Sequence, residues 1–336
     1  MSAIHETPGI GMTAIRFAVR MLSPGGANGR LVILAYHRVL PGPDPMRAFE
    51  VDAVTFDNHM RAVRHYFEAL PLPEALDRLK TGSLPPRAVC VTFDDGYADN
   101  YEVAYPILQR WHVPATFFVA AGYLDGGIMW NDRLIETVRQ VQGKSLDLRG
   151  MGLETYRIAS MKERAEAAMS VLYKIRYFEP RQRMAAIERL IDIVGATPPA
   201  DIMMTSHQVR ALHEGGMEIG GHTLHHPILT RITADEAWRE ITEGKAQLES
   251  IVGKKLSLFA YPNGRPDKDY DARHVKMVKK AGFTAAVSTA WGATRLPIDW
   301  YQLPRIMPWD RTSSRFALRL LHSYTMTADL CQPVAA

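Results

Sequence analysis

Short apolar segments alternate with helical patterns along most of the chain, and this alternation constrains the fold more than any other feature. Each segment is a continuous apolar run, which is typical of a strand covered on both faces. Helix-length intervals between the runs indicate parallel strands and an α/β architecture. The runs are residues 31–37, 87–96, 115–120, 217–222, 256–262 and 283–289. About six or seven mostly parallel strands are most simply arranged as a closed or nearly closed (β/α) barrel, in which functional residues lie at the carboxyl ends of the strands.

Residues 130 to about 200 interrupt this alternation with helical patterns alone. Ser160 and Glu163 form a capping-box pattern before an amphipathic stretch, Pro180 opens a second helix and Gly195 can close it. We therefore predict a helical insertion within one domain. The predicted parts are an N-terminal arm with a short amphipathic helix at 1–28, a barrel domain at 29–325 that includes the insertion at about 130–200, and a tail at 326–336.

Composition and charge exclude several classes of protein. The chain has 336 residues, of which 47% are hydrophobic and 23% charged, and these values are ordinary for a globular protein. The net charge is +4 and the sequence has no dense basic run, so nucleic acid is not an expected partner. Two cysteines cannot form a disulfide framework.

The segment 13–22 is apolar but contains Arg16 and Arg20, so it has the pattern of neither a signal sequence nor a membrane-spanning helix. A packed amphipathic helix and a peripheral membrane anchor are the two interpretations of this segment. Because no export signal is recognised, we expect a cytoplasmic protein, with peripheral membrane contact as the alternative.

Residues that indicate chemistry follow three of the predicted strands. Asp94 and Asp95 end the second run, His222 and His226 follow the fourth, and a Pro-Asn-Gly turn at 262–264 follows the fifth. One Asp and two His are a recurrent ligand set for a catalytic divalent metal, and a separation of four residues lets both imidazoles face one point. The other acid of the pair then has a role of its own, because a free carboxylate can accept a proton from an attacking water.

The tetrapeptide Val-Thr-Phe-Asp occurs twice, at 54–57 and at 91–94. Only the second copy continues with another acid and a glycine. In the first copy a helical pattern follows Asp57, so we interpret this residue as a helix N-cap.

The motifs TFDDG at 92–96 and HTLHHP at 222–227 resemble those of the polysaccharide deacetylases of carbohydrate esterase family 4, the NodB-homology family, and occur in that family's order. The resemblance covers about residues 30–310 apart from the insertion. It implies a distorted (β/α)7 barrel, which agrees with the number of predicted strands. It also implies that Asp94 is the catalytic base and that Asp95, His222 and His226 bind one divalent metal ion, with zinc as the expected metal.

One family motif is altered in this chain. The sequence AYPNG at 260–264 is similar to the family's Arg-x-Pro-Tyr-Gly, but Ala260 replaces the Arg and Asn263 replaces the Tyr. The backbone N–H of Asn263 can still serve in an oxyanion hole, because that role needs no particular side chain. In the family the Arg orients the base, and we predict that Arg305 takes its place.

The general acid also departs from the family pattern. Family members usually carry a Leu-x-His near the end of the barrel, and the late match in this sequence is His322, inside a predicted terminal helix. In some members the motifs are circularly permuted, so that the His comes from the N-terminal strand. His37 ends the first predicted strand, which barrel closure would place beside the last. We therefore predict that His37 protonates the leaving amine.

The resemblance implies a hydrolase that removes N-acetyl or O-acetyl groups from an aminosugar-containing glycan. Without a recognised export signal, the expected substrate is a biosynthetic precursor such as a lipid-linked glycan. The predicted substrate contacts are Tyr97, Tyr261, Pro262 and Trp130, and core packing is an equal alternative for Trp130. Two other functions stay open: hydrolysis of a non-sugar amide at the same metal site, and glycan binding without catalysis.

Overall fold

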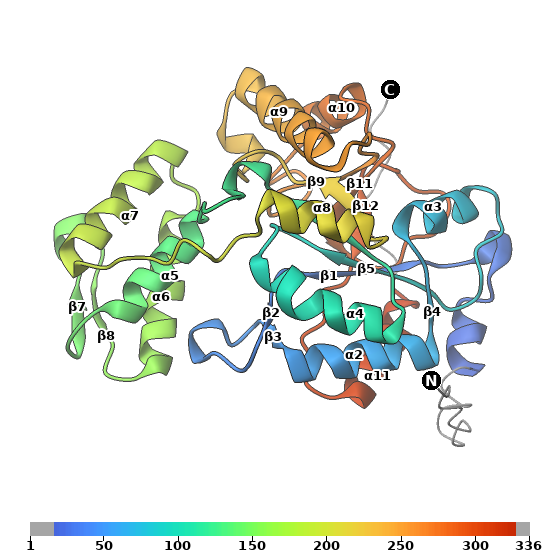
Figure 1. Ribbon diagram of the computed structural model, residues 1–336, viewed down its shortest axis with the longest axis horizontal. Helices are drawn as coiled ribbons and strands as arrows, with labels where there is room; N and C mark the ends of the chain where they lie inside the picture. The colour runs from blue at the N-terminus through green and yellow to red at the C-terminus, as the bar shows by residue number, and fades with distance from the viewer. Residues whose placement is uncertain (1–16, 327–336) are drawn as a thin grey trace.

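The structure, a computed structural model, describes residues 17–326 and is built around a parallel β-barrel (Figure 1). Within these residues, seven strands pair side by side in chain order, and every pair is parallel. The strands are β1 (Val32–Tyr36), β5 (Ala88–Phe93), β6 (Ala115–Val119), β9 (Glu218–Gly221), β10 (Leu258–Ala260), β11 (Ala285–Trp291) and β12 (Leu303–Arg305). A short strand, β4 (Glu68–Ala69), pairs with the start of β5. All six predicted runs form strands, and the fold is the expected (β/α)7 barrel.

Contacts between β1 and the end of β12 close the barrel. Ile306, which directly follows β12, pairs in parallel with Leu34 of β1. Its backbone N–H donates to Ile33, and its carbonyl accepts from Ala35, at 2.8 and 2.9 Å. The first and last barrel strands are therefore neighbours, as predicted, and their carboxyl ends lie at the same face of the barrel.

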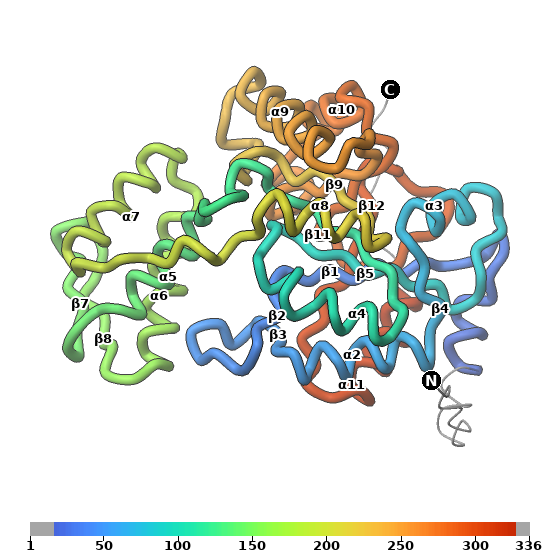
Figure 2. Tube along the Cα trace, in the orientation of Figure 1, coloured from blue at the N-terminus to red at the C-terminus, as the bar shows by residue number. Residues whose placement is uncertain are grey.

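Helices cover the outside of the barrel (Figures 1 and 2). Two of them, α9 and α10, lie together on one side, and α2 and α11 lie together on the opposite side. Two very short strands, β2 (Val39–Leu40) and β3 (Val51–Asp52), form a separate pair before α2. The covering helices are α2 (Ala53–Tyr66), α3 (Leu72–Lys80), α4 (Tyr105–Trp111), α8 (Ser206–Glu214), α9 (Ala234–Val252), α10 (Ala272–Lys280) and α11 (Ser313–Ser323).

The segment predicted as an insertion projects from one side of the barrel and has an apolar core of its own (Figure 1). Its elements are α5 (Trp130–Gln140), β7 (Ser145–Asp147), β8 (Thr155–Arg157), α6 (Met161–Ile175) and α7 (Pro180–Val194). The capping box of Ser160 and Glu163 begins α6, and Gly195 ends α7 with a φ of 66°. The antiparallel pair β7–β8 corrects the expectation of helices alone, because strands of three residues are too short to give a periodic pattern.

The N-cap assigned to Asp57 was wrong. Helix α2 begins at Ala53, and its N-cap is Asp52, five residues before Asp57. The Asp52 side chain accepts a hydrogen bond from the Thr55 backbone N–H. Asp57 lies within α2, and its carboxylate accepts hydrogen bonds from Arg110 and Trp111, each at 3.0 Å.

The described part of the N-terminal arm includes helical residues 17–22, in which Phe17 and Met21 are exposed and Val19 is buried. The rest of the predicted arm, before residue 17, and the tail from residue 327 lie outside the described residues. Among residues 17–326, no helix is both long enough and apolar enough to cross a membrane.

His59 on α2 is a buried histidine that links folding stability to pH. Its ring stacks on Phe316 with 4.0 Å between centroids, Nδ1 lies 3.1 Å from the Tyr36 hydroxyl, and Nε2 lies 2.5 Å from the Asp310 carbonyl oxygen. Burial lowers the pKa of His59 from 6.5 to about 4. Between these values the unfolded chain binds more protons than the folded protein, so stability is complete above pH 6.5 and decreases as the pH falls toward 4.

We expect His59 to account for about 3 kcal/mol of the unfolding free energy that the protein loses between pH 7 and pH 4. Urea unfolding at both pH values measures this loss, and His59→Gln should lose correspondingly less stability than wild type. His207→Gln, at an exposed histidine of α8, is the control and should follow wild type. Equal losses in wild type and His59→Gln would contradict the assignment.

Candidate active site

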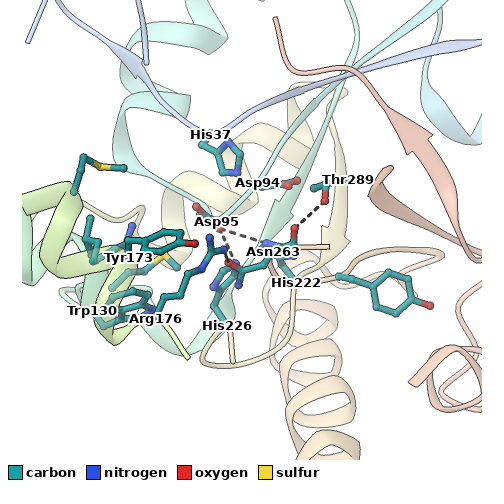
Figure 3. A pocket seen from close by; sticks show the side chains of 15 residues that line it. His37, Asp94, Asp95, Trp130, Tyr173, Arg176, His222, His226, Asn263 and Thr289 are labelled. Atoms are coloured by element: carbon teal, nitrogen blue, oxygen red, sulfur yellow. Dashed lines mark hydrogen bonds and ion pairs between the residues drawn. The ribbon is translucent and has the colours of Figure 1, made fainter. Parts of the chain in front are cut away.

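A cavity at the carboxyl ends of the strands brings together the three predicted metal ligands and the predicted catalytic residues other than Arg305, which lies behind Asp94 and does not line the cavity (Figure 3). The barrel and its loops contribute one part of the lining: His37, Asp94, Asp95, His222, His226, Tyr261, Asn263 and Thr289. The insertion and the residue before it contribute the other: Met129, Trp130, Asn131, Met169, Leu172, Tyr173 and Arg176. The site is therefore shared between the barrel and the insertion.

The three predicted metal ligands converge on one point. Oδ1 of Asp95 lies 3.3 Å from Nε2 of His222 and 3.3 Å from Nε2 of His226. Nδ1 of His222 lies 2.8 Å from the Ala260 carbonyl oxygen, and a carbonyl can only accept a hydrogen bond. The His222 proton therefore resides on Nδ1, and the lone pair of Nε2 faces Asp95.

Left-handed backbone conformations orient two of these ligands. The φ angle is 75° at Asp95 and 52° at His226, in a region that few non-glycine residues adopt. The Ala120 N–H donates to the Asp95 carbonyl at 3.1 Å, and the His226 N–H donates to Thr223 Oγ1 at 3.0 Å. The second bond closes a compact turn between His222 and His226. Backbone strain of this kind is frequent at functional sites.

The donor set fits a divalent cation. One carboxylate oxygen and two ring nitrogens lie within 4.8 Å of one another. Burial lowers the pKa of His226 to about 4, so its ring is neutral near pH 7. Within residues 17–326, Asp95 Oδ1 is buried and has no hydrogen-bond partner. Since this oxygen and His222 Nε2 are both acceptors, a cation between them would remove their repulsion and satisfy both.

Asp94 forms a buried two-point ion pair with Arg305. Nη1 and Nη2 of Arg305 donate to Oδ1 and Oδ2 of Asp94 at 2.7 and 2.6 Å, and its Nε donates to the Ser288 carbonyl at 3.0 Å. Burial raises the pKa of Asp94, but the charge and hydrogen bonds of Arg305 outweigh that effect and hold the pKa below its usual range. Asp94 is thus ionised and fixed in orientation, and this contact supports the predicted role of Arg305.

His37 directly follows β1, and its ring points toward Asp94 and Asp95 (Figure 3). The Asn100 side-chain amide donates to the His37 carbonyl at 2.8 Å and fixes its backbone. Burial lowers the pKa of His37, but the carboxylates of Asp95 and Asp94 outweigh burial and raise it above 6.5. His322, the alternative acid, is exposed on α11 and does not line this cavity.

Asn263 lies in the turn after β10 with a φ of 57°. Its carbonyl accepts a hydrogen bond from Thr289 Oγ1 at 2.9 Å. Its backbone N–H makes no hydrogen bond within residues 17–326. This N–H is therefore unpaired among the described residues, and Asn263 lines the cavity, which is consistent with the predicted role in an oxyanion hole.

The insertion supplies a wall of the cavity that the sequence analysis did not assign. Met169, Leu172, Tyr173 and Arg176 line the cavity, and Nη2 of Arg176 donates to Asn263 Oδ1 at 2.7 Å. Their spacing of three and four residues is that of one helix face. The spacing was visible in the sequence, but the tertiary packing of α6 against the barrel decides that this face meets the cavity.

Two of the four predicted substrate contacts line the cavity, namely Trp130 and Tyr261. Tyr97 and Pro262 do not belong to the lining. The Tyr97 side chain is 2% exposed, and its hydroxyl donates to Asp132 of α5 at 2.9 Å. The expectation that Tyr97 contacts substrate is corrected accordingly: its ring is buried at the junction of barrel and insertion.

Comparison with known sequences identifies relatives of this chain. The family model for "Polysaccharide deacetylase" matches residues 81–177 and 184–286, more than half of the chain, and includes both motifs. "Putative polysaccharide deacetylase YxkH" of Bacillus subtilis is 22% identical over 279 residues, which cover 82% of this chain and 71% of that protein. "Poly-beta-1,6-N-acetyl-D-glucosamine N-deacetylase" of Staphylococcus aureus is 34% identical over 80 residues, which cover 24% of this chain and 28% of that protein.

Solved structures share the fold. The structure of the Streptococcus pyogenes deacetylase PplD in complex with acetate has a TM-score of 0.59 and 20% identity. The match covers 87% of this chain and 98% of that chain. The structure of IcaB from Ammonifex degensii has a TM-score of 0.57 and 19% identity, and the match covers 87% of this chain and 97% of that chain. Since the family model spans more than half of the sequence, this chain belongs to the polysaccharide deacetylase family of hydrolases, which act on carbon–nitrogen bonds other than peptide bonds.

Proposed function

We propose that this protein is a metal-dependent deacetylase that hydrolyses N-acetyl groups of an aminosugar in a glycan or a lipid-linked glycan precursor. One observation carries the proposal: Asp95 Oδ1 lies 3.3 Å from two imidazole nitrogens, and the adjacent Asp94 is held by Arg305 in the same cavity. A ligand set beside a fixed carboxylate is the arrangement that hydrolysis of an amide by an activated water requires.

Asp95, His222 and His226 would hold the metal, and we propose zinc because Asp and His are ligands that zinc binds well. A divalent ion at this point supplies a Lewis acid, which polarises a carbonyl group and lowers the pKa of water.

The residues around the proposed metal site carry out the other steps of the hydrolysis. Asp94 accepts a proton from the water that attacks the acetyl carbonyl carbon. The Asn263 N–H donates a hydrogen bond to the carbonyl oxygen, where negative charge develops. His37 gives a proton to the amide nitrogen as the carbon–nitrogen bond breaks, so that acetate and a free amine leave.

Two observations support N-acetylglucosamine as the sugar. The Staphylococcus aureus relative is named for a polymer of this sugar, although the match covers 28% of that protein. The cavity lining includes the aromatic rings of Trp130 and Tyr173, and flat apolar rings suit the apolar face of a pyranose. The absence of the family Arg is the argument for a non-catalytic protein. The hydrogen bonds between Arg305 and Asp94 support our proposal that Arg305 takes the place of that Arg.

Metal content and acetate release, measured on the same purified sample, test the proposed function. We expect about one metal ion per chain, acetate release from a β-1,6-linked N-acetylglucosamine oligomer, and loss of activity on chelation that zinc restores. Asp95→Ala should lose both metal and activity, whereas His225→Gln should keep both, because the adjacent His225 faces Glu240 at 3.0 Å instead of the metal ligands.

Metal-bound protein that releases acetate from no oligomer would refute the proposed substrate. Turnover of small cyclic amides in its place would identify the non-sugar amide hydrolase. Metal and glycan binding without turnover of either class would identify the non-catalytic alternative.

A further inference from the structure

Four cationic side chains surround the ring of Tyr177, which lies just beyond α6 and next to the active-site cavity. The charged groups of Arg176, Arg231, Lys268 and Arg265 lie 5.2, 5.2, 5.3 and 5.9 Å from the ring centroid. They come from the insertion, from the loop after β9 and from the loop after β10. We call these four residues the basic cluster.

Among residues 17–326, one charge of the basic cluster has a carboxylate partner. Arg265 pairs with Asp269 at 2.9 Å. In the part of the chain that the structure describes, no carboxylate lies within 4.0 Å of the charged groups of Arg176, Arg231 or Lys268. Arg231 and Lys268 are exposed, so a ligand can reach them from solvent. Because like charges repel, a bound anion would stabilise this arrangement.

The basic cluster adjoins the catalytic residues. Arg176 lines the cavity and donates a hydrogen bond to Asn263 Oδ1, and Figure 3 shows it extending from the insertion toward Asn263. Arg265 follows Asn263 by two residues and donates a hydrogen bond to the Tyr177 hydroxyl. A ligand in the cavity can therefore extend a substituent into the basic cluster.

Another cation, Arg183 of α7, adds positive charge behind this wall. Its side chain is 6% exposed, its guanidinium lies 4.4 Å from the ring centroid of Trp130, and its Nη1 donates to the Arg176 carbonyl at 3.0 Å. Within residues 17–326, Arg183 has no carboxylate within 4.0 Å, and its buried Nε has no hydrogen-bond partner. The insertion side of the cavity is therefore electropositive.

We propose that the basic cluster binds a phosphate group carried by the glycan substrate. Guanidinium groups bind phosphate through paired hydrogen bonds, and a phosphate ester offers up to two negative charges and several acceptor oxygens. A ligand that carried a single carboxylate in place of the phosphate would bring only one negative charge, and most of the positive charge of the basic cluster would stay uncompensated. The inference rests on the proposed function, because it assigns the phosphate to the molecule that carries the acetamide.

Three matched substrates test this inference: a β-1,6-linked N-acetylglucosamine trimer, the same trimer with a 1-phosphate, and the trimer oxidised to a terminal carboxylate. We expect wild type to process the phosphorylated trimer with a kcat/KM at least tenfold above that of the neutral trimer. Arg231→Gln/Lys268→Gln should abolish this preference and leave kcat/KM for the neutral trimer unchanged. Added salt should weaken the preference in wild type.

The control variant is Arg157→Gln/Lys162→Gln. It removes two exposed cations near the start of α6, about 20 Å along the helix from the basic cluster. This variant should retain the full preference for the phosphorylated trimer, since only a general effect of net charge would change it.

Binding measurements separate failure of this inference from failure of the proposed function. Calorimetry in the Asp94→Asn background compares the Kd of the phosphorylated and neutral trimers without turnover. Tighter binding of the phosphorylated trimer that depends on Arg231 and Lys268 supports the inference even if no trimer is deacetylated. Equal affinities, no binding of the phosphorylated trimer, or an equal gain from the carboxylate would overturn the assignment of phosphate.

Discussion

Asp94→Asn is expected to lower kcat for acetate release by about 10³-fold while the metal content stays at the wild-type level. The amide keeps the shape of the carboxylate but cannot accept a proton from water. The metal should stay because the predicted ligands are Asp95, His222 and His226, whose side chains the substitution leaves intact. Acetate-release kinetics and elemental analysis of one preparation measure both quantities.

The repeated tetrapeptide provides a matched control for this variant. Asp57→Asn makes the same substitution in the first Val-Thr-Phe-Asp, within α2, where the carboxylate contacts Arg110 and Trp111. It should leave kcat unchanged. If Asp94→Asn retains more than about a tenth of wild-type activity, Asp94 is not the base, because loss of a general base costs at least 10²-fold in typical enzymes.

Arg305→Met should lower the unfolding free energy by about 3 to 5 kcal/mol at pH 7. Arg305 is 1% exposed and Asp94 is 3% exposed, so removing the guanidinium leaves a buried carboxylate without its partner. Urea unfolding measures the loss. Activity should also fall, because the carboxylate is no longer held in one orientation by two hydrogen bonds.

A double variant distinguishes the loss of this ion pair from a general loss of packing. Arg305→Met/Asp94→Asn removes both charges, so it should be more stable than Arg305→Met alone. Equal or lower stability of the double variant would show that the destabilisation has a different cause, such as the loss of the Arg305 hydrogen bond to Ser288.

The fold was predictable where local sequence and tertiary structure favour the same conformation. The six apolar runs are strands in the structure, and the capping box at Ser160 and Glu163 begins α6. Strand β12 and the pair β7–β8 lacked such a signal, because none of them lies within a longer apolar run, as the equally short β10 does. Asp57 was misassigned because two acids near the start of α2 are both suitable caps, and the chain uses Asp52.

The convergence of the predicted metal ligands Asp95, His222 and His226 was predictable, because residues of these types follow two of the predicted strands, at the end of the barrel where chemistry is usually placed. The contribution of α6 to the cavity wall could not be predicted in this way. Helical spacing shows which residues share a face of the helix, but it does not show what that face contacts. Tyr97 illustrates the same limit. It follows the Asp94-Asp95 motif closely, yet its orientation depends on Asp132, which is 35 residues later in the chain.

Barrel closure sets when the catalytic centre can form during synthesis. The hydrogen bonds between Asp94 and Arg305 span 211 residues, and β12 must emerge before it can pair with β11 and meet β1. At roughly 5 to 20 residues per second, more than about ten seconds separate the translation of the two residues. During that interval Asp94 lacks its partner. The nascent chain therefore carries its predicted metal ligands before Asp94, the predicted base, is oriented, and we expect activity only when almost the whole barrel is complete.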